Sequence, residues 1–183
     1  VQGNKKSRQI NALVNEWYLE DLSDNVRSVL THKRWQGDYI ATYALYGYRK
    51  DPADHRRLLP DPAAAAVVRR IFALYLKGYG TARIAKILNR EGIPPPSVYR
   101  QQHGGTARPG TGQWSRATLH QMLTNRTYVG DLEQGRRRKV SYKSAKSVRL
   151  PRAQWLIVPG THEGLVSRAD FDAVQRQLAR RGR

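Results

Sequence analysis

Two short segments decide the fold of this chain. The first reads Thr81-Ala-Arg-Ile-Ala-Lys-Ile-Leu-Asn-Arg-Glu-Gly92, and the second reads Trp114-Ser-Arg-Ala-Thr-Leu-His-Gln-Met-Leu-Thr-Asn125. In both, apolar residues recur every three or four positions, which is typical of a helix with one buried face. Thr81 and Ser115 are hydroxyl residues placed to cap these helices, and Gly92 is placed to end the first. The sequence therefore predicts two small amphipathic helices.

The charge of the chain is large and unevenly distributed. The formal net charge is +19, and residues 1–61 hold ten Lys and Arg against eight Asp and Glu. Residues 62–183 hold twenty-three against six. Such a bias favours a polyanionic partner, and together with the helix pair it predicts a helix-turn-helix reader of double-stranded DNA. A basic protein made soluble by its charge is the weaker interpretation, because the first third lacks the excess.

The remaining patterns predict a mainly α fold with a small β element. Residues 10–34 show the periodicity of one long amphipathic helix, and residues 37–60 indicate an ordered linker rich in tyrosine. Asp61 followed by Pro62 is typical of a helix start, and Ser167-Arg-Ala-Asp170 resembles a capping box before a last helix. Strand-like runs after Gly130 and at residues 155–158 predict a short sheet or wing.

The two deciding segments are separated by residues 93–113. This stretch is rich in Pro and Gly and shows no periodicity. A loop of this length in a compact domain is usually functional or disordered. Its arginines, Arg100 and Arg108, and its lack of acids favour a path along a phosphate backbone, and disorder without nucleic acid is compatible with that role.

The second predicted helix carries the candidate base-reading residues. At 100° per residue, Ala117, Gln121 and Thr124 lie opposite the apolar Leu119, Met122 and Leu123. Glutamine can pair with adenine, and the alanine or threonine methyl can contact the thymine methyl. Flanking side chains extend the predicted base-reading set, which is Ala117, Thr118, His120, Gln121, Thr124 and Asn125.

A second group of residues is suited to phosphate contacts. These residues are cationic, or, like Ser115, lie at a helix start where backbone N–H groups attract anions. The cluster at 136–139 belongs to a basic segment that reaches Arg152 and is predicted to form a cationic flap. The predicted phosphate-binding set is Arg83, Lys86, Arg100, Arg108, Ser115, Arg116, Arg126, Arg136, Arg137, Arg138 and Lys139.

Several site classes are not indicated by the sequence. The chain has no cysteine, and its five histidines are scattered, so no metal site is expected within it. No signal peptide or membrane span is visible, and we expect a cytoplasmic, nucleoid-associated fragment of a longer protein without a membrane partner. No serine has the neighbours that an activated nucleophile needs, so no catalytic residue is assigned.

A resemblance to the large serine recombinases, which include phage integrases and mobile-element transposases, covers nearly the whole chain. The resemblance is specific because of the order and spacing of its motifs along the chain. The resemblance is carried by Asn15-Glu-Trp-Tyr18, Asp21-Leu-Ser23, Tyr46-Gly-Tyr48, Lys50-Asp-Pro52, Val67-Val-Arg-Arg-Ile-Phe72, Gly80, Ile84-Ala85, Leu88-Asn89, Gly92-Ile93, Trp114-Ser115, Met122-Leu123, Asn125, Tyr128, Gly130, His162, Phe171 and Val174-Gln175.

The resemblance implies a division of the chain and of its parent protein. Residues 1–36 would be the long helix from the end of a catalytic domain, 37–60 a linker, 61–160 a DNA-binding recombinase domain, and 161–183 a helix leading toward a zinc ribbon. Zinc would be held only in that ribbon. The parent would cut and rejoin DNA through a serine, as a dimer on each site and a tetramer in synapsis, to integrate or excise a mobile element. The fragment alone would be inactive.

Two other functions are compatible with part of this pattern. A stand-alone helix-turn-helix transcriptional regulator would use the same helix pair, but the long leading helix disfavours it. An RNA-binding protein would need stacking aromatics on a sheet, and the sequence shows no such signature.

Overall fold

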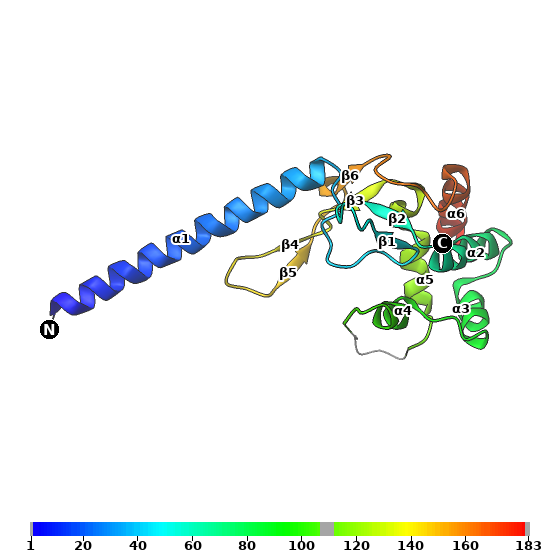
Figure 1. Cartoon of the computed structure of the whole chain (residues 1–183), viewed down its shortest axis with the longest axis horizontal. Helices are drawn as coiled ribbons and strands as arrows, with labels where there is room; N and C mark the ends of the chain where they lie inside the picture. The colour runs from blue at the N-terminus through cyan, green and yellow to red at the C-terminus, as the bar shows by residue number, and fades with distance from the viewer. Residues whose placement is uncertain (1, 107–111, 182–183) are drawn as a thin grey trace. The chain divides into compact units, whose positions relative to one another are not determined.

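The computed structural model describes residues 2–106 and 112–181, with side chains from Lys6 onward. The chain is mainly helical with short pairs of strands, which confirms the predicted fold class (Figure 1). Its contacts group into two units. The first unit contains residues 2–40 and 133–158, and the second contains residues 41–132 and 159–181.

The first unit consists of a long helix and short strands. Helix α1 begins well before the predicted residue 10, and most of its large apolar side chains are exposed, from 47% at Leu22 to 67% at Tyr18. Strand β4 pairs antiparallel with β5, and β6 pairs with β3 (Leu132–Gln134), which crosses from one unit into the other. The elements are α1 (Gln2–Trp35), β4 (Arg137–Lys139), β5 (Ser147–Arg149), the 3-10 turn η2 (Arg152–Gln154) and β6 (Leu156–Val158).

The second unit contains the remaining helices and a two-stranded hairpin. Its core is centred on α2, whose Val68, Ile71 and Phe72 are at most 1% exposed. Helix α6 packs against α2 and buries Phe171 and Val174. The elements are β1 (Tyr48–Lys50), β2 (Leu58–Pro60), α2 (Pro62–Leu76), α3 (Thr81–Arg90), α4 (Pro96–Gln102), α5 (Arg116–Leu123), the 3-10 turn η1 (Arg126–Val129) and α6 (Arg168–Arg181).

The second half of the expected linker contributes to this core. Tyr46 and Tyr48 are 8% and 4% exposed, so these two tyrosines of the expected linker pack inward. The Tyr48 hydroxyl donates to the Thr127 carbonyl at 3.0 Å, and the Tyr128 hydroxyl donates to the Tyr46 carbonyl at 3.0 Å. Burial raises the pKa of both Tyr46 and Tyr48, so both phenols stay neutral donors.

The helix starts confirm some predicted caps and contradict others. The Ser167 hydroxyl oxygen accepts the Asp170 N–H at 3.1 Å, as the capping box predicts. Asp61 is the N-cap residue of α2, but its carboxylate makes no cap hydrogen bond and accepts instead from the Tyr99 hydroxyl at 2.7 Å. The predicted cap at Thr81 is wrong, because Thr81 is the first helical residue and Gly80 is the N-cap.

The prediction of a structureless segment over 93–113 is also wrong in part. Helix α4 forms in the first half of this segment, with Pro96 in the first turn, where the fixed φ of proline suits a helix start. The Tyr99 ring lies edge-on to Tyr46, with ring centroids 5.3 Å apart, and stacks on His103 at 4.2 Å. Burial, together with the hydrogen bond to Asp61 and its charge, raises the pKa of Tyr99 to about 12. The contacts of Tyr99 with Tyr46 and Asp61 hold α4 against the rest of the second unit.

Candidate nucleic-acid interface

A pair of hydrogen bonds between Asn89 and Trp114 joins α3 to the start of α5. The Asn89 Oδ1 accepts the Trp114 N–H at 2.8 Å, and the Asn89 Nδ2 donates to the Trp114 carbonyl at 3.1 Å. The Trp114 indole N–H donates to the Ile93 carbonyl at 2.9 Å, and the side chain is 3% exposed. We call this arrangement the Asn89–Trp114 clamp. It brings together two helices that are separated by more than twenty residues.

Helix α5 forms with the cap and the buried face that the sequence predicts. The Ser115 hydroxyl oxygen accepts the Thr118 N–H at 3.1 Å, which confirms the predicted cap. Leu119 and Leu123 are fully buried, and Met122 is 5% exposed. Because these three residues face the core, the opposite side of α5 faces solvent.

The predicted base-reading residues fall into two groups. Ala117, His120 and Gln121 are exposed. Thr118, Thr124 and Asn125 are only partly exposed, and their side chains bond locally. The Thr124 hydroxyl donates to the His120 carbonyl at 2.8 Å, and the Asn125 Oδ1 accepts the Thr127 N–H at 3.1 Å as the cap of η1. Asn125 therefore has a structural role that the helical-wheel argument missed, and a base-reading role for it stays a prediction.

The predicted phosphate-binding residues of the second unit lie around the same helices. Arg83, Lys86 and Arg116 are exposed, and the Arg83 guanidinium lies 4.5 Å from the centre of the Tyr79 ring. The Arg100 guanidinium lies 5.2 Å from the centre of the Tyr43 ring. The remaining residues of the set in this unit are Ser115, which is exposed and caps α5; Arg126, which is partly exposed; and Arg108, which lies outside the described residues.

The cationic cluster at 136–139 belongs to the first unit. Arg136 pairs with the buried carboxylate of Glu133 at 3.1 Å. Arg137, Arg138 and Lys139 form β4 and are exposed. The predicted flap is therefore a two-stranded antiparallel hairpin, with Arg137 directly opposite Arg149.

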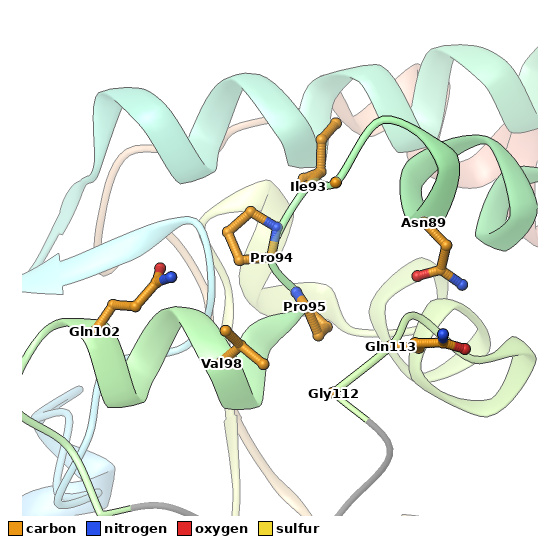
Figure 2. Close-up of a pocket in the computed structure, with 9 residues that line it drawn as sticks. Asn89, Ile93, Pro94, Pro95, Val98, Gln102, Gly112 and Gln113 are labelled. Atoms are coloured by element: carbon orange, nitrogen blue, oxygen red, sulfur yellow. The ribbon is translucent and has the colours of Figure 1, made fainter.

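A shallow depression lies beside the clamp. Figure 2 shows its lining side chains, which come from the end of α3, the proline run, α4 and the residues before α5. Its volume is about 230 Å³. That is below the range of roughly 300–1,000 Å³ that is usual for small-molecule sites, so the depression is not assigned a ligand.

Neither a cluster of metal-ligating side chains nor a membrane-spanning helix is found among residues 2–106 and 112–181. No three His, Asp or Glu side chains gather there in a way that could hold a metal ion. None of the helices in these ranges has an apolar stretch of the length that crossing a bilayer requires.

His162 is a half-buried residue that packs against the η1 turn, and the sequence did not predict this packing. Its Nε2 lies 2.7 Å from the Thr127 carbonyl and must donate, which leaves Nδ1 to accept from the Thr161 hydroxyl at 2.8 Å. The ring also lies edge-on to Tyr48. Burial lowers the pKa of His162, and the Thr127 hydrogen bond and the charge of Asp131 oppose that shift.

This lowered pKa predicts a pH-dependent stability. Because the unfolded histidine, with a pKa of about 6.5, binds a proton more readily than the folded one, the free energy of unfolding should fall as pH drops below about 6.5. Urea unfolding between pH 7.5 and 5.5 should show a smaller fall for His162→Gln than for the unmodified chain. The exposed His120→Gln is the control and should keep the full fall. An equal fall in all three proteins contradicts the prediction.

The fold and these surfaces define a mainly helical module that presents a cationic two-helix face and a basic hairpin. A family model described as Recombinase matches residues 62–181. The chain therefore belongs to the Recombinase family. A comparison with curated proteins finds no match.

Several solved structures resemble the chain, among them the following two. One, reported as the crystal structure of an LSR–DNA complex, is 21% identical with a TM-score of 0.49, and the match covers 85% of this chain and 40% of that one. The other, from work on the sequence requirements of the Listeria innocua prophage attP site, is 21% identical with a TM-score of 0.50, and the match covers 85% of this chain and 52% of that one. At 21% identity, the match to the second structure, with its TM-score of 0.50, supports the fold and nothing finer. The chain spans about half of the second relative and less of the first.

Proposed function

We propose that this chain is the DNA-binding part of a large serine site-specific recombinase and that it recognises one half of a recombination site. Membership of the Recombinase family supports this proposal. The structural relative associated with a prophage attP site supports it as well, since attP is a DNA sequence. The parent protein would exchange DNA strands through a serine of another domain, as a dimer on each site and a tetramer in synapsis, in the cytoplasm.

The observation that carries the proposal is the exposed face of α5. It consists of Arg116, Ala117, His120 and Gln121, and it contains no acid. A helix of this kind, supported from behind by a second helix, is the usual device for reading the major groove. Arg116 in the first turn is placed for a phosphate, and Gln121 can pair with an adenine edge.

The charge around this face supports the same partner. Arg83 and Lys86 on α3 are exposed beside α5, and each phosphate that such groups neutralise releases counterions. Binding to duplex DNA should therefore weaken steeply with salt. Competition between duplex DNA and duplex RNA tests the partner class, and a preference for RNA contradicts the proposal.

Gln121→Ala tests the assignment of the reading helix. A preferred duplex is first selected from a randomised pool with the unmodified chain. The variant should then lose about 1–3 kcal/mol of discrimination at one or two base pairs, because its bidentate contact to a base edge is removed. The measurement is binding to the selected duplex and to single-base variants of it at fixed salt.

The matched control is Gln36→Ala, which removes another exposed glutamine, just after the end of α1. It should leave discrimination unchanged. If Gln121→Ala weakens selected and random duplexes by the same factor, α5 does not read bases.

A further inference from the structure

Three arginines of the first unit surround one tryptophan. The guanidinium carbons of Arg136 and Arg149 each lie 5.4 Å from the centre of the Trp155 ring, and that of Arg152 lies 5.8 Å from it. All three fall within the distance of about 6 Å at which a cation is attracted by an aromatic ring. We call this group the Trp155 cluster.

Trp155 is held in place by its surroundings. Its indole N–H donates to the Leu150 carbonyl at 2.8 Å, and its backbone N–H donates to the Arg152 carbonyl at 3.1 Å. The Leu150 N–H in turn donates to the Arg136 carbonyl at 3.0 Å, which joins the two sides of the hairpin. The ring is therefore a fixed platform at the base of the β4–β5 hairpin, and the arginines reach it from separate segments.

The positive charge of the cluster is only partly compensated within the chain. Glu133 is buried and pairs with Arg136. Arg149 and Arg152 are exposed, and neither forms an ion pair with any residue in the described ranges. In addition, Arg149 stands directly opposite Arg137 across the hairpin. Like charges in directly opposite positions destabilise a strand pair, so this arrangement is most stable when an anion lies between or over them.

We propose that the Trp155 cluster is a second DNA-contacting surface, separate from α5, which binds the phosphodiester backbone of the duplex without reading bases. This inference rests on the proposed function, since it assumes a duplex DNA partner. Arg149 and Arg152 make the phosphate contacts, because planar guanidinium groups match phosphate oxygens in pairs. Trp155 is a positioning residue that orders both guanidinium groups before binding.

The test is the salt dependence of binding to the selected duplex. Arg149→Gln and Arg152→Gln should each reduce the slope of log K against log salt by about 0.9, the value for one lost phosphate contact. Trp155→Leu keeps every charge but should weaken binding roughly 3- to 10-fold, the range of one or two exposed cation–π contacts, and should flatten the slope. Trp155→Phe retains a ring and should recover most of the affinity, which a purely structural role of the indole hydrogen bond would not allow.

Lys146→Gln is the matched control, since Lys146 is an exposed cation of the same hairpin that is not at the ring. If it flattens the slope as much as the arginine variants do, the hairpin acts as diffuse charge and the cluster is not a site. Effects on duplex RNA without effects on DNA also overturn the proposal. If Gln121→Ala alters binding to the selected duplex but the substitutions at Arg149, Arg152 and Trp155 do not, this inference alone is refuted. If the unmodified chain binds no duplex DNA, the proposed function itself is refuted.

Discussion

Trp114→Ala should lower the free energy of unfolding by about 3–5 kcal/mol, the usual cost of truncating a buried aromatic side chain. Trp114 is 3% exposed, donates to the Ile93 carbonyl and lies edge-on to Tyr46, with ring centroids 5.5 Å apart. Since small domains are stable by only about 5–15 kcal/mol, such a loss should unfold a sizeable share of the molecules at 37 °C and weaken specific DNA binding. Urea titration followed by circular dichroism measures the loss.

The control for this prediction is Trp17→Ala. Trp17 is 63% exposed on α1, so the same substitution should change the free energy of unfolding by no more than about 0.5 kcal/mol. Equal costs at the two positions would show that the clamp tryptophan is not a core residue in solution.

Gly130→Ala should lower the free energy of unfolding by about 2–5 kcal/mol for two separate reasons. Gly130 has φ +90°, a left-handed conformation that costs a side-chain-bearing residue about 1–2 kcal/mol. A Cβ at this position would also lie 2.7 Å from the His162 carbonyl oxygen, which belongs to the backbone and cannot rotate away. Overpacking of this kind adds about 1–3 kcal/mol. The measurement is chemical denaturation at constant pH.

Gly92→Ala separates the two contributions. Gly92 has φ +68°, and no atom lies within 4 Å of a Cβ built there. This variant should therefore show only the cost of the left-handed backbone. If both variants cost the same, the close approach between the η1 turn and the segment at His162 is not present in solution.

Local patterns predicted several helix ends because helix ends depend on neighbouring residues. Ser115, Ser167 and Gly92 act where the sequence places them. The predicted cap at Thr81 is wrong because Gly80 already provides the extended backbone that an N-cap needs, so the helix starts one residue earlier than a Thr81 cap would require. Asp61 starts a helix as predicted, but its carboxylate bonds to Tyr99, a partner 38 residues away that no local rule identifies.

The exposed face of the candidate interface could be predicted from the sequence, but the contacts that hold its elements in place could not. The spacing of Leu119, Met122 and Leu123 correctly predicted the buried face of α5 and the exposure of Ala117 and Gln121, but Thr124 is only partly exposed. The Asn89–Trp114 clamp and the Trp155 cluster depend on residues that meet only after folding. The basic run at 136–139 drew attention to the hairpin, whereas Arg149 and Arg152 could be recognised only once the ring between them was known.

The Asn89–Trp114 clamp fixes the start of α5 to α3 through direct hydrogen bonds and not only through the peptide that connects the two helices. Because the clamp is formed by residues at the two ends of that connection, the length between them enters only through loop-closure entropy, which rises by about 0.6 kcal/mol for each doubling. We therefore expect that residues inserted between α4 and α5 would leave the position of α5 against α3 unchanged.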